Sequence, residues 1–303
     1  MIKPKASIII LTHNGIKDYL KKTLDSVFKQ VFSGSFEVIA IDSESTDETI
    51  SLLKKYPAIK IKKIKKADFG HGKTRRLGAE LAKGELVVFL TQDATPVNSR
   101  WLENITRDFK DPEVVGVCGR VLPRSDACLL KKIEVNNDLS GRKEKITSQI
   151  RDKEAFKQLS FYEKRLNYYF FNDVSSCVRK SYLLSKPPID VVFAEDVEFA
   201  KMALNDKKKI VFEPASKVFH SHDYSVLKTY QRNFVDSKYH KEFLKIKNVP
   251  TLKNVFQNTI FQIRRDFSQI DNYKPNFIDK IKAIAYSPII HFAEQIGQYK
   301  GTK

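Results

Sequence analysis

The chain has 303 residues, of which 42% are hydrophobic and 30% charged, so it can bury a full core and an intrinsically disordered chain is excluded. Its formal net charge of +18 predicts attraction to polyanions, which include nucleic acid, an anionic membrane surface and phosphate-bearing substrates. The chain has three cysteines, Cys118, Cys128 and Cys177. Because three is an odd number and their spacing is not that of metal ligands, they indicate free thiols in a reducing compartment.

The first residues lack the features of a secretory signal. Lys3 and Lys5 precede only the short apolar run 8–11, and no small-residue cleavage site follows it. No stretch of the sequence approaches the ~20 apolar residues that a membrane-spanning helix requires. We therefore expect the protein to stay in the cytoplasm.

Strand and helix signals alternate in the first half of the chain. Strands are predicted over residues 7–12, 36–41, 59–64 and 86–90. The intervening segments predict three helices: one with Leu20, Leu24, Val27 and Val31 at helical spacing, one opened by a capping box at Ser45 and Glu48, and one over 73–83. This alternation predicts an α/β fold with a Rossmann-like, mostly parallel sheet. The usual glycine-rich dinucleotide and NTPase loops are absent from the sequence.

After residue 114 the alternation of strand and helix signals becomes irregular. Short strands are predicted over 114–117, 173–178, 209–212 and 217–219, with a helix over about 196–204 and polar helices and loops over 126–159. Beyond Ser225 the pattern is helical to the end of the chain. It contains two apolar stripes, and the second is expected to break at Pro288; the stripes are Phe256, Ile260, Ile263, Phe267 and Ile270, then Ile278, Ile281, Ala285, Phe292 and Ile296.

These basic amphipathic helices leave two interpretations open. Lys280 and Lys282 flank the second stripe, and a basic amphipathic helix can lie on an anionic membrane surface. The same apolar stripes can instead dock onto the rest of the protein.

Four polar residues fall where predicted strands end: Thr12, Asn14, Asp42 and Asp93. Taken singly, each is explained by turn chemistry. In an open α/β sheet, however, ligands bind beyond the carboxyl ends of the strands. Together the four residues are therefore expected to line a crevice, in which Asp42 accepts a hydrogen bond from a nucleobase or ribose and Asp93 holds a cation.

Two segments at these strand ends resemble the family-2 glycosyltransferases of the GT-A fold. Residues 7–15 are similar to that family's first strand and turn, and residues 41–49 to its nucleotide-binding segment. Five further segments are most similar to bacterial rhamnosyltransferases: 69–78, 90–94, 194–196, 220–225 and 232–236. The resemblance covers about residues 5–240. It implies a GT-A catalytic domain over 1–240 and a helical C-terminal extension over 241–303.

The sequence departs from the family pattern at two positions. The family's metal motif is usually Asp-x-Asp, whereas Thr91-Gln92-Asp93 keeps only the last carboxylate, as the rhamnosyltransferase-like members do. Arg76 stands where an Asn is more usual.

The resemblance implies a site for a nucleotide-sugar donor and a divalent cation. A donor that leaves as a diphosphate needs its developing charge neutralised, and Mg²⁺ or Mn²⁺ does this as a Lewis acid. Asp93 is the expected carboxylate ligand, with His220 or His222 completing the set, although the two histidines can also simply pair with carboxylates. The donor-binding residues expected are Thr12, Asn14, Asp42, Ser45, His71, Lys73, Arg75, Gln92 and Asp93.

The resemblance also assigns a base and an acceptor side. Asp196 is the expected catalytic base and Glu195 its neighbour, and the start of a helix favours ionised carboxylates. Ser175 and Ser176 belong to a segment that lines the acceptor side in the family, and Trp101 either packs under a sugar or fills the core.

The resemblance therefore implies a metal-dependent, inverting glycosyltransferase. The expected donor is dTDP-L-rhamnose, and the expected acceptor is a cell-surface polysaccharide or lipid-linked oligosaccharide at the inner face of the cell membrane. A nucleic-acid-binding protein is the alternative that the charge suggests, but no nucleic-acid-binding motif supports it. A nucleotidyltransferase on a similar sheet is a third possibility.

Overall fold

The computed structural model describes residues 3–17, 19–160, 163–164, 167–189 and 194–303. The chain forms two compact units, the first made of residues 1–122 and 138–220 and the second of residues 123–137 and 221–303. This division differs from the expected boundary at residue 240, because helix α10 (Val226–Leu244) packs along helix α12 (Phe277–Thr302) within the second unit.

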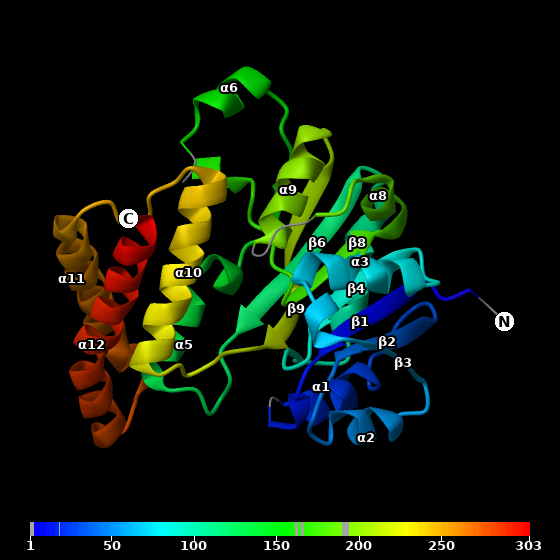
Figure 1. The fold of residues 1–303 in the computed structure, drawn as a ribbon, viewed down its shortest axis with the longest axis horizontal. Coiled ribbons are helices and arrows are strands. Elements are labelled where there is room, and N and C mark those ends of the chain that lie inside the picture. Colours follow the sequence, from blue (N-terminus) through cyan, green and yellow to red (C-terminus); the bar gives the residue numbers. More distant parts are fainter. Residues whose placement is uncertain (1–2, 18, 161–162, 165–166, 190–193) are drawn as a thin grey trace. The chain divides into compact units, whose positions relative to one another are not determined.

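The first unit is built on one mixed sheet (Figure 1), with strand order β3-β2-β1-β4-β8-β6-β9-β5 and β7 beside β9. Strands β8, β5 and β7 run antiparallel to their neighbours, and the other pairs are parallel. The predicted mostly parallel α/β sheet is therefore confirmed. The strands are β1 (Ala6–Thr12), β2 (Phe36–Ser43), β3 (Ile59–Ile64), β4 (Leu86–Thr91), β5 (Thr95–Pro96), β6 (Val114–Leu122), β7 (Ile146–Ser148), β8 (Ser175–Arg179) and β9 (Lys209–Phe219).

Helices cover the faces of this sheet because its strands are apolar on both sides. Ile9, Ile41 and Phe89 pack in one buried cluster with α3, α8 and α9. Gly78 of α3 is required there, since an added Cβ would lie 2.5 Å from Ile9 Cγ2. The helices of the first unit are α1 (Leu20–Val27), α2 (Thr49–Lys54), α3 (His71–Leu81), α4 (Trp101–Thr106), α6 (Lys153–Gln158), α8 (Lys180–Ser185) and α9 (Glu195–Asn205).

Several predicted element boundaries are wrong. Helix α1 ends at Val27, and Val31 is exposed. The predicted capping box fails because the Ser45 hydroxyl donates to the buried Asp42 carboxylate, so α2 begins only at Thr49. The two strands predicted over 209–212 and 217–219 are a single strand, β9, and the polar segment 126–159 contributes the unpredicted strand β7.

The second unit is helical, as predicted for the residues after Ser225. It contains α5 (Leu129–Asn137), α10, α11 (Leu252–Gln269) and α12. Helix α12 continues through Pro288, contrary to the predicted break, because residues on both sides of the proline are buried by packing against α10 and α11. Gly297 allows the close approach of α12 to α10, since a Cβ there would lie 2.6 Å from the Tyr230 carbonyl oxygen.

The two predicted apolar stripes lie largely at the surface. Phe256, Ile260 and Phe267 of α11 are exposed, whereas Ile270, beyond its end, is buried in the unit's own core. On α12, Ile278 and Ile281 are exposed as well. Within the described ranges, no helix has both the length and the apolar character needed to cross a membrane.

A buried charged cluster joins α11 to α12. Asp266 Oδ2 lies 2.6 Å from His291 Nε2 and accepts a 2.8 Å hydrogen bond from the Ser287 hydroxyl, while Arg265 lies 2.9 Å from Asp266 Oδ1. Burial alone would lower the pKa of His291, but the contacts with Asp266 and Glu294 outweigh it and raise that pKa to about 9.

The free energy of unfolding is expected to fall as the pH rises from 6.5 to 9. The folded-state pKa of His291 is raised above the unfolded value of about 6.5, so its contribution is complete below pH 6.5 and is lost as the pH passes through about 9. Urea unfolding followed by circular dichroism at pH 6 and pH 9 measures this loss. The His291→Gln variant should show a much smaller difference between the two pH values, and an equal difference would contradict the assignment.

Candidate active site

The turns after β1 and β2 are tied together by hydrogen bonds. The Asn14 backbone N–H donates to the Ser45 hydroxyl over 2.9 Å, and Asn14 Oδ1 accepts from the Thr46 N–H over 2.8 Å. The Asn14 backbone is left-handed, with φ 48°, a conformation that Asn tolerates better than most residues. Asp42 is buried and accepts from the Thr12 and Ser45 hydroxyls. Asp42 therefore connects these two turns. Its predicted contact with a nucleobase or ribose stays a prediction.

A pocket of about 520 Å³ opens between these turns and the end of β3. This volume is in the range of small-molecule sites. Two lysines that were not predicted as site residues, Lys63 and Lys66, also line this pocket. Lys63 belongs to the lysine-rich strand β3, which is typical of a solvated edge, and Lys66 begins the short 3₁₀ helix that follows. The pocket is lined by His13, Asn14, Asp42, Glu44, Ser45, Thr46, Ile50, Lys63, Ile64 and Lys66.

Gln92 explains why the chain departs from an Asp-x-Asp pattern. Its Oε1 accepts from the His13 backbone N–H over 3.0 Å, and its Nε2 donates to the His13 carbonyl over 3.2 Å. An amide can donate and accept at once, which an ionised carboxylate cannot do. Gln92 therefore fixes the end of β4 to the turn after β1.

A second pocket, of about 200 Å³, adjoins this clamp and is lined by Thr12, His13, His71, Arg75 and Gln92, among others. His71 begins α3, and burial followed by the nearby Arg75 charge lowers the pKa of its imidazole. Lys73 is exposed on the same helix. Four of the predicted donor-binding side chains therefore share this pocket, and Lys73 is not among its lining residues.

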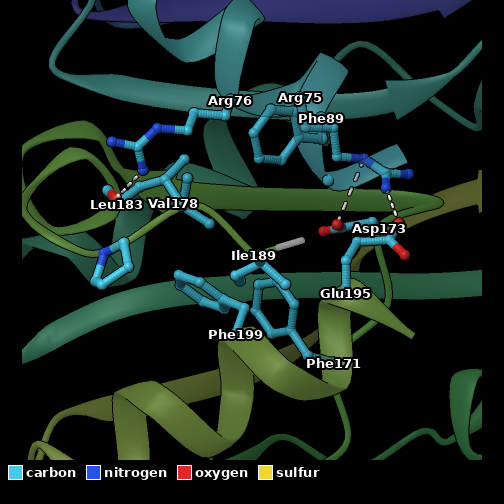
Figure 2. A pocket seen from close by; sticks show the side chains of 12 residues that line it. Arg75, Arg76, Phe89, Phe171, Asp173, Val178, Leu183, Ile189, Glu195 and Phe199 are labelled. Atoms are coloured by element: carbon cyan, nitrogen blue, oxygen red, sulfur yellow. Dashed lines mark hydrogen bonds and ion pairs between the residues drawn. The ribbon is translucent and has the colours of Figure 1, made fainter. Parts of the chain in front are cut away.

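Arg75 is directed at carboxylates (Figure 2). Its Nε lies 3.4 Å from Asp173 Oδ2, and its Nη1 forms an ion pair with Glu195. All three side chains are nearly buried. Arg75 also lines the pocket beside Gln92, so its predicted contact with donor phosphates stays a prediction, although two carboxylates already balance its charge. The apolar cavity beneath the ion pairs measures only about 30 Å³, room for a water molecule or two rather than a sugar.

Asp196 has an unusual environment at the start of α9. Helix α9 follows Ala194, whose backbone is left-handed with φ 61°, and such strain concentrates at functional sites. Burial first, then the neighbouring Asp173 and Glu195, raise the pKa of Asp196 to about 7. The expectation that the helix start keeps this carboxylate ionised is thus incomplete, because burial outweighs the helix dipole. A pKa near 7 is the value that suits a general base at neutral pH.

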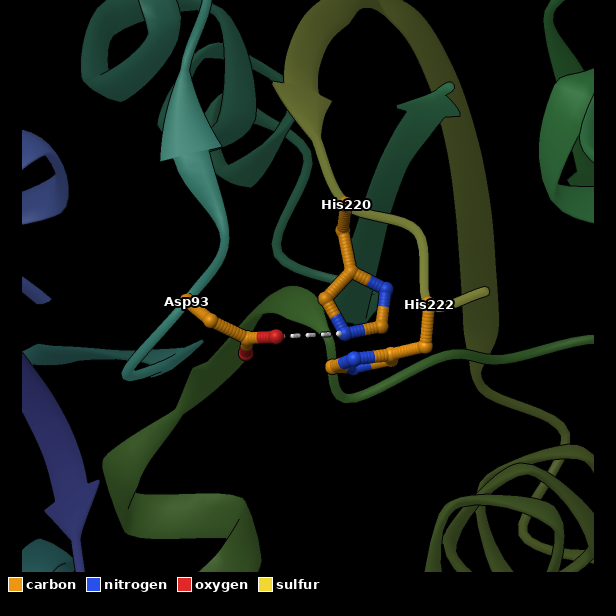
Figure 3. Close-up of side chains that lie close together, drawn as sticks. All are labelled: Asp93, His220 and His222. Atoms are coloured by element: carbon orange, nitrogen blue, oxygen red, sulfur yellow. Dashed lines mark ion pairs between the residues drawn. The ribbon is translucent and has the colours of Figure 1, made fainter. Parts of the chain in front are cut away.

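Asp93 and His220 point toward one another from separate segments of the first unit (Figure 3), with 3.4 Å between Asp93 Oδ2 and His220 Nε2. Strand β9 ends at Phe219, so the His-x-His segment follows the strand rather than belonging to it. A carboxylate oxygen and an imidazole nitrogen at this separation are a donor set that Mn²⁺ accepts. His222 is the second residue of the second unit's 221–303 segment, and its ligand role stays a prediction.

The residues expected on the acceptor side are covered by protein. Trp101 and Ser176 are 0% exposed and Ser175 is 1% exposed. The Trp101 indole N–H donates to the Ser175 hydroxyl, and the Ser176 hydroxyl donates to Asp173. This burial contradicts direct contact with an acceptor and confirms the interpretation of Trp101 as a core residue.

Asp173 belongs to the segment that resembles the family's acceptor side, but its ion pair with Arg75 was not predicted. It sits in the same segment as Ser175 and Ser176, and it reaches Arg75 while accepting a 2.6 Å hydrogen bond from Ser176. The sequence signal was a carboxylate at the first position of the predicted strand 173–178, which also suits a turn.

Comparison with known sequences agrees with this geometry. The family description "Glycosyl transferase family 2" matches residues 7–177. The O-antigen chain rhamnosyltransferase RfbN of Salmonella typhimurium is 30% identical over 239 residues, which is 78% of this chain and 72% of that protein. The O-antigen chain rhamnosyltransferase WbaN of Salmonella anatum is 31% identical over 240 residues, with the same coverage of 78% and 72%.

Solved structures agree on the fold. The mannosyltransferase PcManGT from Pyrobaculum calidifontis, in complex with GDP-Man and Mn²⁺, superposes with a TM-score of 0.58 at 15% identity and covers 99% of this chain and 86% of that one. Staphylococcus aureus TarS residues 1–349 give a TM-score of 0.52 at 18% identity, covering 98% and 89%. The fold is therefore of the GT-A type, and the family match over more than half of the chain places the protein among glycosyltransferases: it belongs to glycosyl transferase family 2.

Proposed function

We propose that this glycosyltransferase transfers L-rhamnose from dTDP-L-rhamnose, with inversion, to a hydroxyl of a cell-surface polysaccharide or lipid-linked oligosaccharide. The observation that carries the mechanism is the Asp196 carboxylate, with its pKa of about 7, in the same unit as the Asp93–His220 pair. The choice of sugar and acceptor is supported by the two O-antigen chain rhamnosyltransferases to which the chain is similar.

In the proposed reaction Asp196 accepts the proton of the acceptor hydroxyl. The acceptor oxygen forms a bond to the anomeric carbon of the sugar while the bond from that carbon to the diphosphate breaks, and dTDP leaves with the bonding electrons. This single displacement inverts the anomeric centre and needs no covalent enzyme intermediate. Arg75 binds Glu195 and Asp173, and it thereby orients the start of α9 that carries the base.

Asp93 and His220 would hold a divalent cation. His222 would be a third ligand, because it is only two residues from His220 in the chain. The two residues from His220 to His222 span at most about 7 Å, so both imidazoles can reach one ion. A bound Mg²⁺ or Mn²⁺ would supply Lewis-acid stabilisation of the charge on the leaving diphosphate.

Donor and cation are tested by the melting temperature of the protein with nucleotides and sugar nucleotides, each with and without Mg²⁺ or Mn²⁺. Selective stabilisation by dTDP and dTDP-rhamnose that requires a cation is expected, because a ligand that binds only the folded protein raises its stability. Asp93→Asn should remove the cation requirement together with most of the stabilisation.

Asp152→Asn is the matched control for this variant. Asp152 is exposed and caps α6, and Asn caps a helix equally well. Stabilisation by UDP or GDP in place of dTDP would contradict the rhamnose donor. Equal dTDP affinity of Asp93→Asn with and without cation would contradict the metal site.

We further propose that α11 and α12 lie against an anionic membrane surface. The support is a set of exposed apolar residues on both helices, joined where the Phe256 and Phe292 rings lie 6.2 Å apart. Lys253 and Lys280 stand on the same helices, and basic residues gain about 1 kcal/mol each near anionic lipid. The exposed apolar residues are Leu252, Phe256, Ile260, Phe261, Phe267, Phe277, Ile278, Ile281, Ile284, Ile289 and Phe292.

Sedimentation with vesicles that contain phosphatidylglycerol tests this surface. Phe261 and Phe277 are 69% and 77% exposed, so replacing both by Ser should leave the fold intact. The double variant is expected to bind vesicles at least about tenfold more weakly, since each ring buries apolar area in the membrane. Val31→Ser, at an exposed position of the first unit, should bind as the wild type does. Equal binding of the double variant would exclude this surface.

A further inference from the structure

The second unit contains a groove of about 810 Å³ that the reaction described above does not use. It lies between the segment that leads into α5 and the first half of α12. Most of its lining is apolar or aromatic, as in Leu129, Leu130, Tyr273, Ala285, Tyr286 and Ile289. The volume is within the range of sites that bind small molecules of mostly apolar character.

Charged groups stand at the same groove. Lys132 and Lys282 line it, and in the described part of the chain neither has a carboxylate within ion-pair distance. Two carboxylates, Asp126 and Asp279, also line the groove. Asp279 accepts a 3.0 Å hydrogen bond from Asn276, which holds it at the start of α12. The two lysines can therefore meet an anionic group attached to an apolar chain.

The groove is connected to the catalytic segment through a few residues of chain. Within the second unit, the Cys128 N–H donates to Asp223 Oδ2 over 3.0 Å, and the Arg124 N–H donates to the Ser221 hydroxyl over 3.1 Å. Asp223 follows His220 by three residues, a stretch that spans at most about 11 Å. A molecule seated beside Cys128 is thus joined by a short segment to the proposed cation ligand.

We propose that this groove binds the isoprenoid chain of a lipid-linked acceptor, with the diphosphate of that acceptor near Lys132 and Lys282. The inference rests on the proposed function, because a lipid-linked acceptor is the lipid that must be held near the catalytic segment. A groove of this size takes the first few isoprene units, and the rest of a longer chain would stay outside it. Membrane acyl chains share the apolar chemistry, and the comparison with hexadecyl phosphate below distinguishes them from an isoprenoid chain.

Direct binding to the full-length protein tests the groove without relying on turnover. The probe is geranylgeranyl diphosphate, with hexadecyl phosphate and geranylgeraniol as comparison ligands, and Kd is measured by equilibrium dialysis. Ala285 is exposed and lines the groove, so Ala285→Phe fills it without changing the core. Kd for geranylgeranyl diphosphate is expected to rise at least tenfold in this variant. Lys282→Gln should raise Kd for the diphosphate and leave geranylgeraniol binding unchanged.

Ala155→Phe is the matched control, because it adds the same ring at an exposed position of α6 in the first unit. It should bind every probe as the wild type does. If Ala285→Phe bound geranylgeranyl diphosphate with wild-type affinity, the groove would not be the binding site. If hexadecyl phosphate bound as tightly as geranylgeranyl diphosphate, the isoprenoid assignment would be wrong. The cation-dependent response to dTDP-rhamnose, measured in the same samples, reports separately on the donor. If this response to dTDP-rhamnose were absent, the proposed function would be contradicted, but the proposal that the groove binds a lipid would not.

Discussion

Replacing Asp196 by Asn is expected to lower kcat for sugar transfer by about 10²–10⁴-fold, the usual contribution of a general base. The amide has the shape of the carboxylate but cannot accept the proton of the acceptor hydroxyl. Donor affinity should change by less than about twofold, because the variant loses an interaction made only in the transition state. Transfer rates and dTDP-rhamnose binding, measured on the same preparation, separate these two effects.

The same residue predicts the pH profile of the wild-type enzyme. Since burial and its carboxylate neighbours raise the pKa of Asp196 to about 7, kcat/KM should fall with decreasing pH below about 7 as the base becomes protonated. Glu198→Gln, on the same helix and at a residue that forms an ion pair with Lys201, should keep that profile and nearly full activity. Turnover of Asp196→Asn near the wild-type rate would refute the base assignment.

Replacing Arg75 by Met is expected to destabilise the first unit by about 3–5 kcal/mol, the cost of breaking a buried ion pair from one side. Asp173 and Glu195 would then be nearly buried without their cationic partner. An unpaired buried carboxylate is relieved by protonation, so the loss should be smaller at pH 5 than at pH 8. Urea unfolding at the two pH values measures this difference.

Arg76→Met is the control for the Arg75 variant. Arg76 is the next residue on α3, but its guanidinium binds the Lys186 carbonyl and the half-exposed Glu80, so its loss should cost only about 1 kcal/mol. In addition, Arg75→Met should raise the pH at which kcat/KM declines, because the Arg75 charge favours the ionised form of Asp196. Similar stability of the two variants would show that the Asp173–Arg75–Glu195 ion pairs do not organise the site.

Local patterns determined much of the fold from the sequence. The sequence predicted strands β1 to β4 nearly residue for residue. Strands β1, β2 and β4 are mostly apolar because both of their faces are covered, whereas β3 mixes isoleucines with exposed lysines. The helical segment after Ser225 was equally clear, and the segments that resemble glycosyltransferases are enough to indicate the family. These features depend on short stretches of chain, where the spacing of apolar residues or a local motif identifies the element.

Partners and burial were decided only by the tertiary structure. Arg75 has the character of a phosphate-binding cation in the local sequence, because its carboxylate partner Glu195 lies 120 residues away and no nearby residue indicates that pairing. Ser45 has the spacing of a helix cap, but the buried Asp42 takes its hydroxyl instead. Trp101 suits a sugar platform as well as a core position, and its complete burial selects the core. The position of a residue in the sequence indicates which local roles its side chain can take, such as a helix cap or a phosphate ligand. Desolvation and charges from distant parts of the chain decide which of these roles has the lowest free energy in the folded protein.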